Sequence, residues 1–73
     1  MTLQILTIPE GKNIVYVKTL WECLGMNLNE AMDVYRLYKA GKPALINESE
    51  YYPAAIERLI ERFTKLRIGY QRF

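Results

Sequence analysis

The sequence contains no histidine and only one cysteine, Cys23. Histidine is the commonest acid–base residue near neutral pH and a common metal ligand, so sites that depend on it are excluded. A single cysteine excludes an internal disulfide and any zinc site built from several thiolates. Because no disulfide framework is present, we expect a reducing compartment. Cys23 has no basic neighbour in the sequence that would make it a thiolate, so we expect an inert, semi-buried thiol.

Long apolar runs and a strong net charge are also missing. The apolar runs are a few residues long, against the ~20 that a membrane-spanning helix needs. The N-terminal stretch MTLQILTIPE has neither the basic start nor the apolar run of a signal peptide. A total of 10 Lys and Arg against 8 Asp and Glu gives a net charge of +2, which alone is too weak to indicate nucleic-acid binding. We therefore expect a soluble, cytoplasmic protein without membrane contacts.

The chain is rich in apolar residues instead, which make up 51% of its 73 positions. This composition predicts one small packed domain spanning residues 1–73. The sequence shows no Gly-rich phosphate loop, no nucleophile–base pairing and no metal-ligand spacing. The carboxylates Glu30 and Asp33 are three residues apart, which fits a helix cap and a solvated face better than acid–base chemistry. We expect no enzymatic activity, no cofactor and no metal.

Most secondary structure follows from the residue pattern. Residues Leu3–Ile8 predict a strand that ends at the Pro-Glu-Gly sequence beginning at Pro9. Residues Asn27–Ala40 predict a helix with a capping-box start, Asn27 followed by Glu30, and a stripe at helical spacing. That stripe consists of Leu28, Ala31, Met32, Tyr35 and Tyr38. Gly41 and Pro43 end this helix.

The second half of the chain predicts a strand, a helix and a final strand. The strand covers Pro43–Asn47, and Pro53 suits the first turn of the helix that follows. The buried face of this helix is predicted to carry Ile56, Leu59, Ile60, Phe63 and Leu66. Residues 68–73 alternate in the manner of a strand.

The segment Asn13–Leu24 is ambiguous. Residues Ile14–Val17 favour a strand by propensity, which would allow a hairpin with the first strand. The same segment has apolar residues on one helical stripe, and Gly25 stands where a helix commonly ends. That stripe consists of Ile14, Val17, Leu20 or Trp21, and Leu24. The residue pattern leaves both structures open.

Aromatic residues are more frequent than one small core needs, with 6 Tyr, 1 Trp and 2 Phe. Tyr16, Trp21, Tyr51 and Tyr52 cannot all face inward, and Tyr, Trp and Arg are the residues that anchor protein interfaces. The charge is also uneven, because the segment Arg58–Phe73 carries five basic residues and one acidic residue. This basic segment is a candidate face for RNA or an acidic partner.

The stretch Lys12–Val34, KNIVYVKTLWECLGMNLNEAMDV, resembles the C-terminal domain of the bacterial ribosomal stalk protein, the large-subunit protein that recruits translation GTPases. The family pattern is a strand, a Lys-rich helix and then T-G-L-x-L-K-E-A-K. Residues Leu24–Ala31 match the turn and the start of the second helix. Four positions agree with the Lys-rich helix: Ile14, Val17, Lys18 and Leu20. The likeness continues through Pro43–Ile46 as the second strand and Ala55–Leu66 as the third helix.

This resemblance implies a compact β-α-α-β-α-β fold of the α+β class, with a three-stranded sheet covered by three helices. It favours a helix over the ambiguous segment. It also implies a partner-binding face that comprises Ile14, Val17, Lys18, Trp21, Gly25 and Met32. Basic residues of the family are replaced at three positions, by Asn13, Trp21 and Met32. Cationic contacts have become apolar, so we expect a more apolar partner than a translation GTPase.

The resulting hypothesis is a non-enzymatic protein-binding module, a stand-alone stalk-like domain. We expect a small regulator, such as a virus-encoded one, that acts on a host translation or transcription component. The first alternative is a Clp-type protease adaptor, whose general fold is the same and to which Tyr38–Ile46 is similar. The adaptor's acidic stretch and helix His are replaced here by Pro9–Asn13 and Tyr38. The second alternative is a small DNA- or RNA-binding regulator that uses Arg58, Arg62, Lys65, Arg67 and Arg72.

Overall fold

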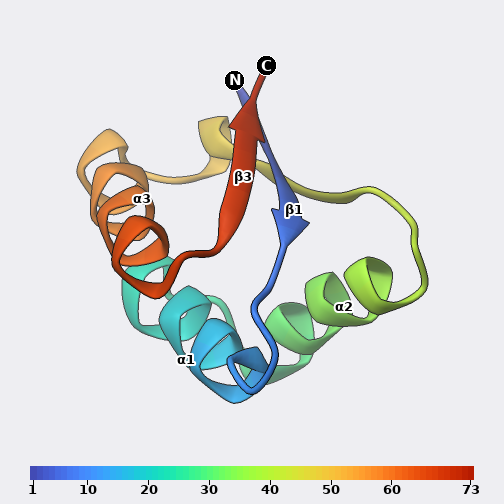
Figure 1. Ribbon diagram of the computed structural model, residues 1–73. Coiled ribbons are helices and arrows are strands. Elements are labelled where there is room, and N and C mark those ends of the chain that lie inside the picture. The colour runs from blue at the N-terminus through green and yellow to red at the C-terminus, as the bar shows by residue number, and fades with distance from the viewer.

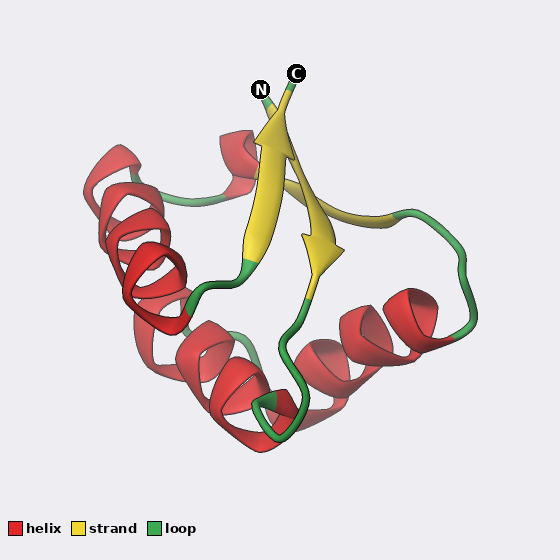
Figure 2. Cartoon of the chain, in the orientation of Figure 1, coloured by secondary structure: helices red, strands yellow, loops and turns green.

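The computed structural model describes all residues from Met1 to Phe73 and has the element order β-α-α-β-α-β that the sequence predicts (Figure 1). The elements are β1 (Thr2–Thr7), α1 (Asn13–Leu24), α2 (Leu28–Lys39), β2 (Ala44–Asn47), α3 (Pro53–Leu66) and β3 (Gly69–Arg72). A short 3₁₀ helix, η1 (Glu48–Glu50), connects β2 to α3. The predicted α+β fold with three strands and three helices is confirmed (Figure 2).

The three strands form an antiparallel sheet in the order β2-β1-β3, so the first strand of the chain is the central one. Side chains alternate between the two faces of a strand, and β1 places Leu3 and Ile5 in the core. Leu3 is paired in register with Ile46 of β2, which is also buried. The strands therefore bury one face against the helices. The two ends of the chain lie side by side at one end of the sheet (Figure 1).

Residues Asn13–Leu24 form helix α1, as the stalk resemblance implies, and not the strand of a hairpin. Tyr16, Leu20 and Cys23 are buried at helical spacing, and α1 packs against both α2 and α3. This packing overrides the strand propensity of the β-branched residues in the first turn. Of the apolar stripe of α1, Val17, Leu20 and Leu24 are buried, whereas Ile14 and Trp21 are 75% and 59% exposed.

The turn between α1 and α2 follows the predicted capping pattern. Gly25 adopts a left-handed conformation with φ 69° directly after α1. The Asn27 side-chain oxygen accepts a hydrogen bond from the Glu30 backbone N–H at 2.8 Å, and the Asn27 amide donates to the Glu30 carboxylate at 3.0 Å. Leu28 of the predicted stripe is the first residue of α2 and is 65% exposed.

Helix α3 closes the core over the sheet. Pro53 occupies its first turn, as predicted, and the predicted residues Ile56, Leu59 and Phe63 are buried. Ile60 and Leu66 are only partly buried and pack at the edge of the core. One cluster of 15 buried apolar residues connects the sheet with all three helices.

Candidate binding groove

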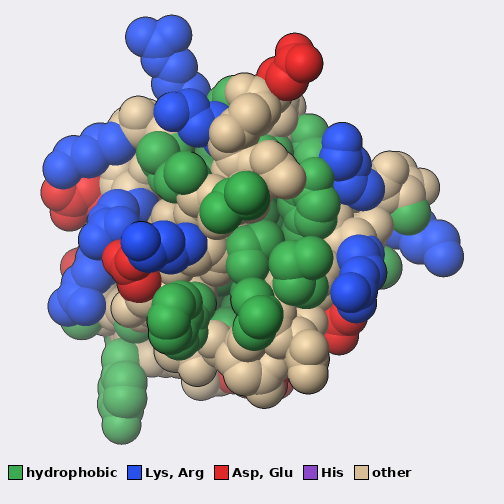
Figure 3. Space-filling model, turned by 90° about the horizontal axis from the view of Figure 1, so that it is seen from below, with side chains coloured by type: hydrophobic (Ala, Val, Ile, Leu, Met, Phe, Trp, Pro, Cys, Tyr) green, Lys and Arg blue, Asp and Glu red, His purple; other side chains and the backbone are tan.

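A groove with a volume of about 360 Å³ lies between α1 and α2. Seen from the side of these two helices, hydrophobic side chains gather in the middle of the surface, with Lys and Arg side chains around them (Figure 3). The groove is lined from α1 by Asn13, Ile14, Val17, Lys18 and Trp21, and from α2 by Leu28, Met32 and Tyr35. We call this set the α1–α2 groove.

Large apolar side chains of the α1–α2 groove are unusually exposed. Ile14 is 75% exposed, Leu28 65% and Trp21 59%, whereas Val17 is nearly buried between them and the core. Single exposed apolar residues are common on soluble proteins, but a contiguous apolar groove marks a binding site more often than chance. These three side chains therefore make the groove the strongest candidate site of the molecule.

The structure brings together most of the predicted partner-binding residues. Ile14, Val17, Lys18, Trp21 and Met32 all line the groove. Gly25 does not; its N–H donates to the Trp21 carbonyl at 3.0 Å, and its left-handed backbone sets the turn between the two helices. Leu28 and Tyr35 also line the groove but are not among the predicted site residues, since helical spacing alone does not distinguish a groove from a core.

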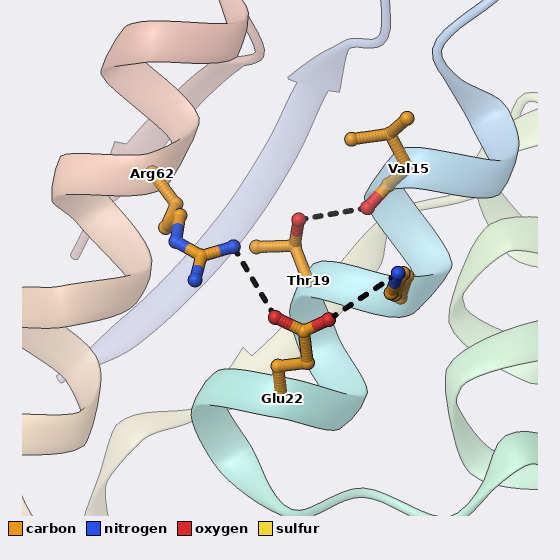
Figure 4. A network of polar contacts seen from close by, with 5 residues as sticks. Val15, Thr19, Glu22 and Arg62 are labelled. Atoms are coloured by element: carbon orange, nitrogen blue, oxygen red, sulfur yellow. Dashed lines mark hydrogen bonds and ion pairs between the residues drawn. The ribbon is translucent and has the colours of Figure 1, made fainter.

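Lys18 is the only charged residue of the groove lining. Its Nζ lies 3.8 Å from one carboxylate oxygen of Glu22, and the other oxygen of Glu22 lies 3.4 Å from the guanidinium of Arg62 on α3. Figure 4 shows the Glu22 side chain reaching from α1 toward Arg62 on α3, and the Thr19 hydroxyl donating to the Val15 carbonyl within α1. Two cations thus share one carboxylate, which leaves one positive charge in excess beside the groove.

A second, more polar recess of about 270 Å³ adjoins the groove and shares Asn13 and Tyr35 with it. The Tyr38 hydroxyl in this recess accepts a hydrogen bond from the Ile8 N–H at 3.0 Å. Its charged lining residues are Glu10 and Lys39. A positively charged ligand would meet one carboxylate and one cation here.

Three of the five basic residues of the C-terminal segment already pair with carboxylates. Arg62 contacts Glu22 at 3.4 Å, Lys65 contacts Glu61 at 3.6 Å, and Arg72 holds Glu48 through two hydrogen bonds of 2.9 and 2.6 Å. No ion pair involves Arg58 or Arg67. Phosphate groups would compete with internal carboxylates for most of this surface.

Few other side chains have the chemistry of a nucleophile or a metal ligand. Cys23 is buried, and burial raises the pKa of its thiol, although the nearby charges of Arg62 and Arg58 act in the opposite direction. No group of three or more Cys, Asp or Glu side chains is placed to hold a metal ion. None of the helices combines the length and the apolar character that crossing a bilayer requires.

No protein-family model, curated protein or solved structure matches the chain. The geometry of the α1–α2 groove is therefore the basis on which a function can be proposed.

Proposed function

We propose that the chain is a non-enzymatic protein-binding module and that its partner docks in the α1–α2 groove. The observation that carries this proposal is the exposure of Ile14, Trp21 and Leu28 around one concave apolar surface. Nothing within the chain covers these side chains. Interface centres are enriched in aromatic residues and Met, and this groove contains Trp21, Tyr35 and Met32.

The energy available from this surface fits a specific interaction. Trp21 retains 59% of its surface in water, and burial of such an area contributes roughly 2–4 kcal/mol before the ordering of the two partners is subtracted. Ile14 and Leu28 add to this gain. Tryptophan is also among the residues that most often dominate measured interface energies. We therefore assign Trp21 as the main anchor.

The resemblance to the ribosomal stalk domain supports the same surface. Ile14, Val17 and Lys18 agree with the family's factor-binding helix, whereas Trp21 and Met32 replace its cations. A partner matched to this face presents apolar side chains where a translation GTPase presents charge. The proposed role is a small stalk-like regulator of a translation or transcription component.

The test replaces Trp21 by Arg, the residue type of the resembled family. Trp21 points outward, so Trp21→Arg is expected to keep the circular dichroism spectrum and melting temperature of the wild type. Partner capture should fall about tenfold or more, which corresponds to roughly 1.4 kcal/mol. The measurement is quantitative mass spectrometry of proteins retained by each variant, followed by the affinity of the purified partner.

The matched control is Tyr52→Arg, because Tyr52 is 85% exposed and lies at the start of α3 outside the groove. This variant should capture the partner like the wild type. Equal loss in both variants, or unfolding of Trp21→Arg, would reject the groove as the binding site. Retained nucleic acid whose binding weakens steeply with salt would instead support the DNA- or RNA-binding alternative.

A further inference from the structure

Four polar side chains line the α1–α2 groove, and two of them, Asn13 and Tyr35, can both donate and accept hydrogen bonds. The Lys18 ammonium and the Trp21 indole N–H can only donate. Trp21 makes no side-chain hydrogen bond within the chain. Lys18 and Trp21 are three residues apart on α1, so their side chains are neighbours on one helix face. An occupant that buries Trp21 must supply an acceptor for its N–H.

The charge beside the groove favours an anionic acceptor. Lys18 and Arg62 share the single carboxylate of Glu22, and the Lys18 contact is the longer one at 3.8 Å. A carboxylate from outside can therefore join Lys18 without breaking the Glu22–Arg62 contact of 3.4 Å. The whole chain has the same sign of charge, +2. Charge complementarity thus points to an acidic side chain in the occupant.

The shape of the groove suits a helix. Its lining residues run from Asn13 to Trp21 on α1 and from Leu28 to Tyr35 on α2, which is about 11–12 Å at 1.5 Å per residue. About two turns of a partner helix cover this length and present apolar residues at positions i, i+3 or i+4, and i+7. The backbone hydrogen bonds of a helix are made within the helix itself. The apolar walls of the groove therefore need not supply hydrogen-bond partners for the backbone of the occupant.

We infer, building on the function proposed above, that the occupant is an amphipathic helix of another protein whose apolar face carries one Asp or Glu. Its carboxylate accepts hydrogen bonds from the Lys18 ammonium and the Trp21 indole N–H, while its apolar side chains cover Ile14, Leu28 and Met32. This arrangement gives an acceptor to Lys18 and Trp21, the two groups of the groove that can only donate, and matches the excess positive charge beside them.

A second copy of this chain would offer no unpaired carboxylate from the two helices that form the groove. Helices α1 and α2 contain three carboxylates, and each is already engaged within the chain. Glu22 contacts Lys18 and Arg62, Glu30 is bonded to the Asn27 amide at 3.0 Å, and Asp33 pairs with Arg36 at 3.0 Å. A copy that presented α1 or α2 to the groove would therefore have to share a carboxylate that is already engaged within its own chain.

The test uses randomised amphipathic helical peptides of about 14 residues, displayed and selected on the intact protein. Trp21 is the only tryptophan, so its fluorescence reports directly on occupation of the groove by each synthesised peptide. Selected peptides should be enriched in one acidic residue at a fixed place on the apolar face. Replacement of that residue by Gln, or Lys18→Glu in the protein, should weaken binding about tenfold.

A charge swap supplies the specific control. A peptide with Lys in place of its acidic residue should bind Lys18→Glu better than the wild type. Lys42→Glu changes the net charge equally but lies outside the groove, so it should leave binding of the acidic peptide unchanged. Equal losses in Lys18→Glu and Lys42→Glu would show a general charge effect and overturn the carboxylate contact.

The remaining outcomes separate this inference from the proposed function. Apolar peptides that shift Trp21 emission without any acidic preference would overturn the inference and leave groove binding intact. Peptides that bind wild type and Trp21→Arg equally would reject both. Concentration-dependent self-association that shifts Trp21 emission would identify a second copy as the occupant and overturn the inference.

Discussion

At the scale of single residues, Tyr16 combines a favourable and an unfavourable contribution to the core. Its side chain is fully buried, and its hydroxyl has no hydrogen-bond partner. The ring lies between Tyr35 and Phe63, with centroid distances of 6.3 and 6.0 Å. Burial raises the pKa of the Tyr16 hydroxyl well above its usual range. A buried donor without an acceptor opposes folding by about 1–3 kcal/mol, so the ring of Tyr16 stabilises the core while its oxygen destabilises it.

Tyr16→Phe is therefore expected to raise the free energy of unfolding by about 1 kcal/mol, because it keeps the ring and removes the unsatisfied oxygen. Urea denaturation followed by circular dichroism measures the change. Tyr35→Phe is the matched control on the facing helix, where the side chain is only partly buried, and should change stability much less. A destabilised Tyr16→Phe protein would mean that the hydroxyl has a partner in solution.

Individual site residues were predictable where the resembled stalk pattern marks them. Ile14, Val17 and Lys18 agree with that pattern. Trp21 and Met32 each take the place of one of its cations. Leu28 and Tyr35 carry no such signal, since apolar residues at helical spacing look the same whether they face a core or a groove. Their role emerged only from the position of α1 beside α2.

At the scale of elements, the packing of α1 explains why the sequence of this segment did not decide between helix and strand. It also explains why the side of α1 that faces the core could not be predicted. One side of α1 packs into the core through Tyr16 and Leu20, and another side forms the groove through Ile14 and Trp21. Apolar residues on both sides remove the contrast that periodicity needs. Helix α2 begins with the Asn27 cap, and α3 begins with Pro53 and has a regular apolar stripe. The bounds of both helices were therefore predicted closely from the sequence.

Helices α1 and α3 both end at a residue in the left-handed conformation, Gly25 and Arg67, and substitutions at these two residues should have opposite effects on stability. Gly25 has φ 69°, and a Cβ added there would meet nothing within 4 Å, so a substitution is opposed by backbone conformation alone. Gly25→Val is expected to destabilise the fold by more than about 1 kcal/mol. Arg67 ends α3 with φ 61° and is the only non-glycine residue with positive φ. Arg67→Gly is expected to stabilise by roughly 0.5–1 kcal/mol.

Thermal unfolding of both variants checks these two predictions. A side chain is unfavourable at a left-handed position, so adding one at Gly25 should lower the melting temperature and removing the one at Arg67 should raise it. Gly25→Asn is the intermediate control, since Asn tolerates the left-handed region better than Val. A Gly25→Val protein as stable as the wild type would contradict the turn geometry between α1 and α2. A destabilised Arg67→Gly protein would show that the Arg67 side chain contributes more than its backbone strain removes.

At the scale of the whole molecule, contacts near the two ends of the chain close the fold. The N–H of Thr2 donates to the Phe73 carbonyl at 2.6 Å, and the N–H of Glu48 donates to the Met1 carbonyl at 3.0 Å. Arg72 then binds both carboxylate oxygens of Glu48, whose side chain is only 8% exposed. The beginning, middle and end of the chain thus meet at one place. The pair of Glu48 and Arg72 was not predictable from sequence, because its members are 24 residues apart.

The contact between Glu48 and Arg72 makes the free energy of unfolding decrease in acid. The hydrogen bond from Arg72 lowers the pKa of Glu48 below its ordinary value of 4.5, although burial acts to raise it. A carboxylate whose pKa is lower in the folded state contributes stability above the unfolded pKa. That contribution is lost as the pH falls through the folded pKa. The Glu48–Arg72 pair should therefore stabilise fully near neutral pH and progressively less below about pH 4.5.

Urea denaturation of wild type and Glu48→Gln at neutral pH and near pH 3 tests this directly. The variant should be less stable than the wild type at neutral pH, and the difference should shrink in acid because Glu48 is then increasingly protonated. Glu61→Gln is the control, since Glu61 and Lys65 form a pair exposed at both ends, and its effect should be small at either pH. A Glu48→Gln deficit that stays constant with pH would show that the side chain acts through packing rather than through its charge.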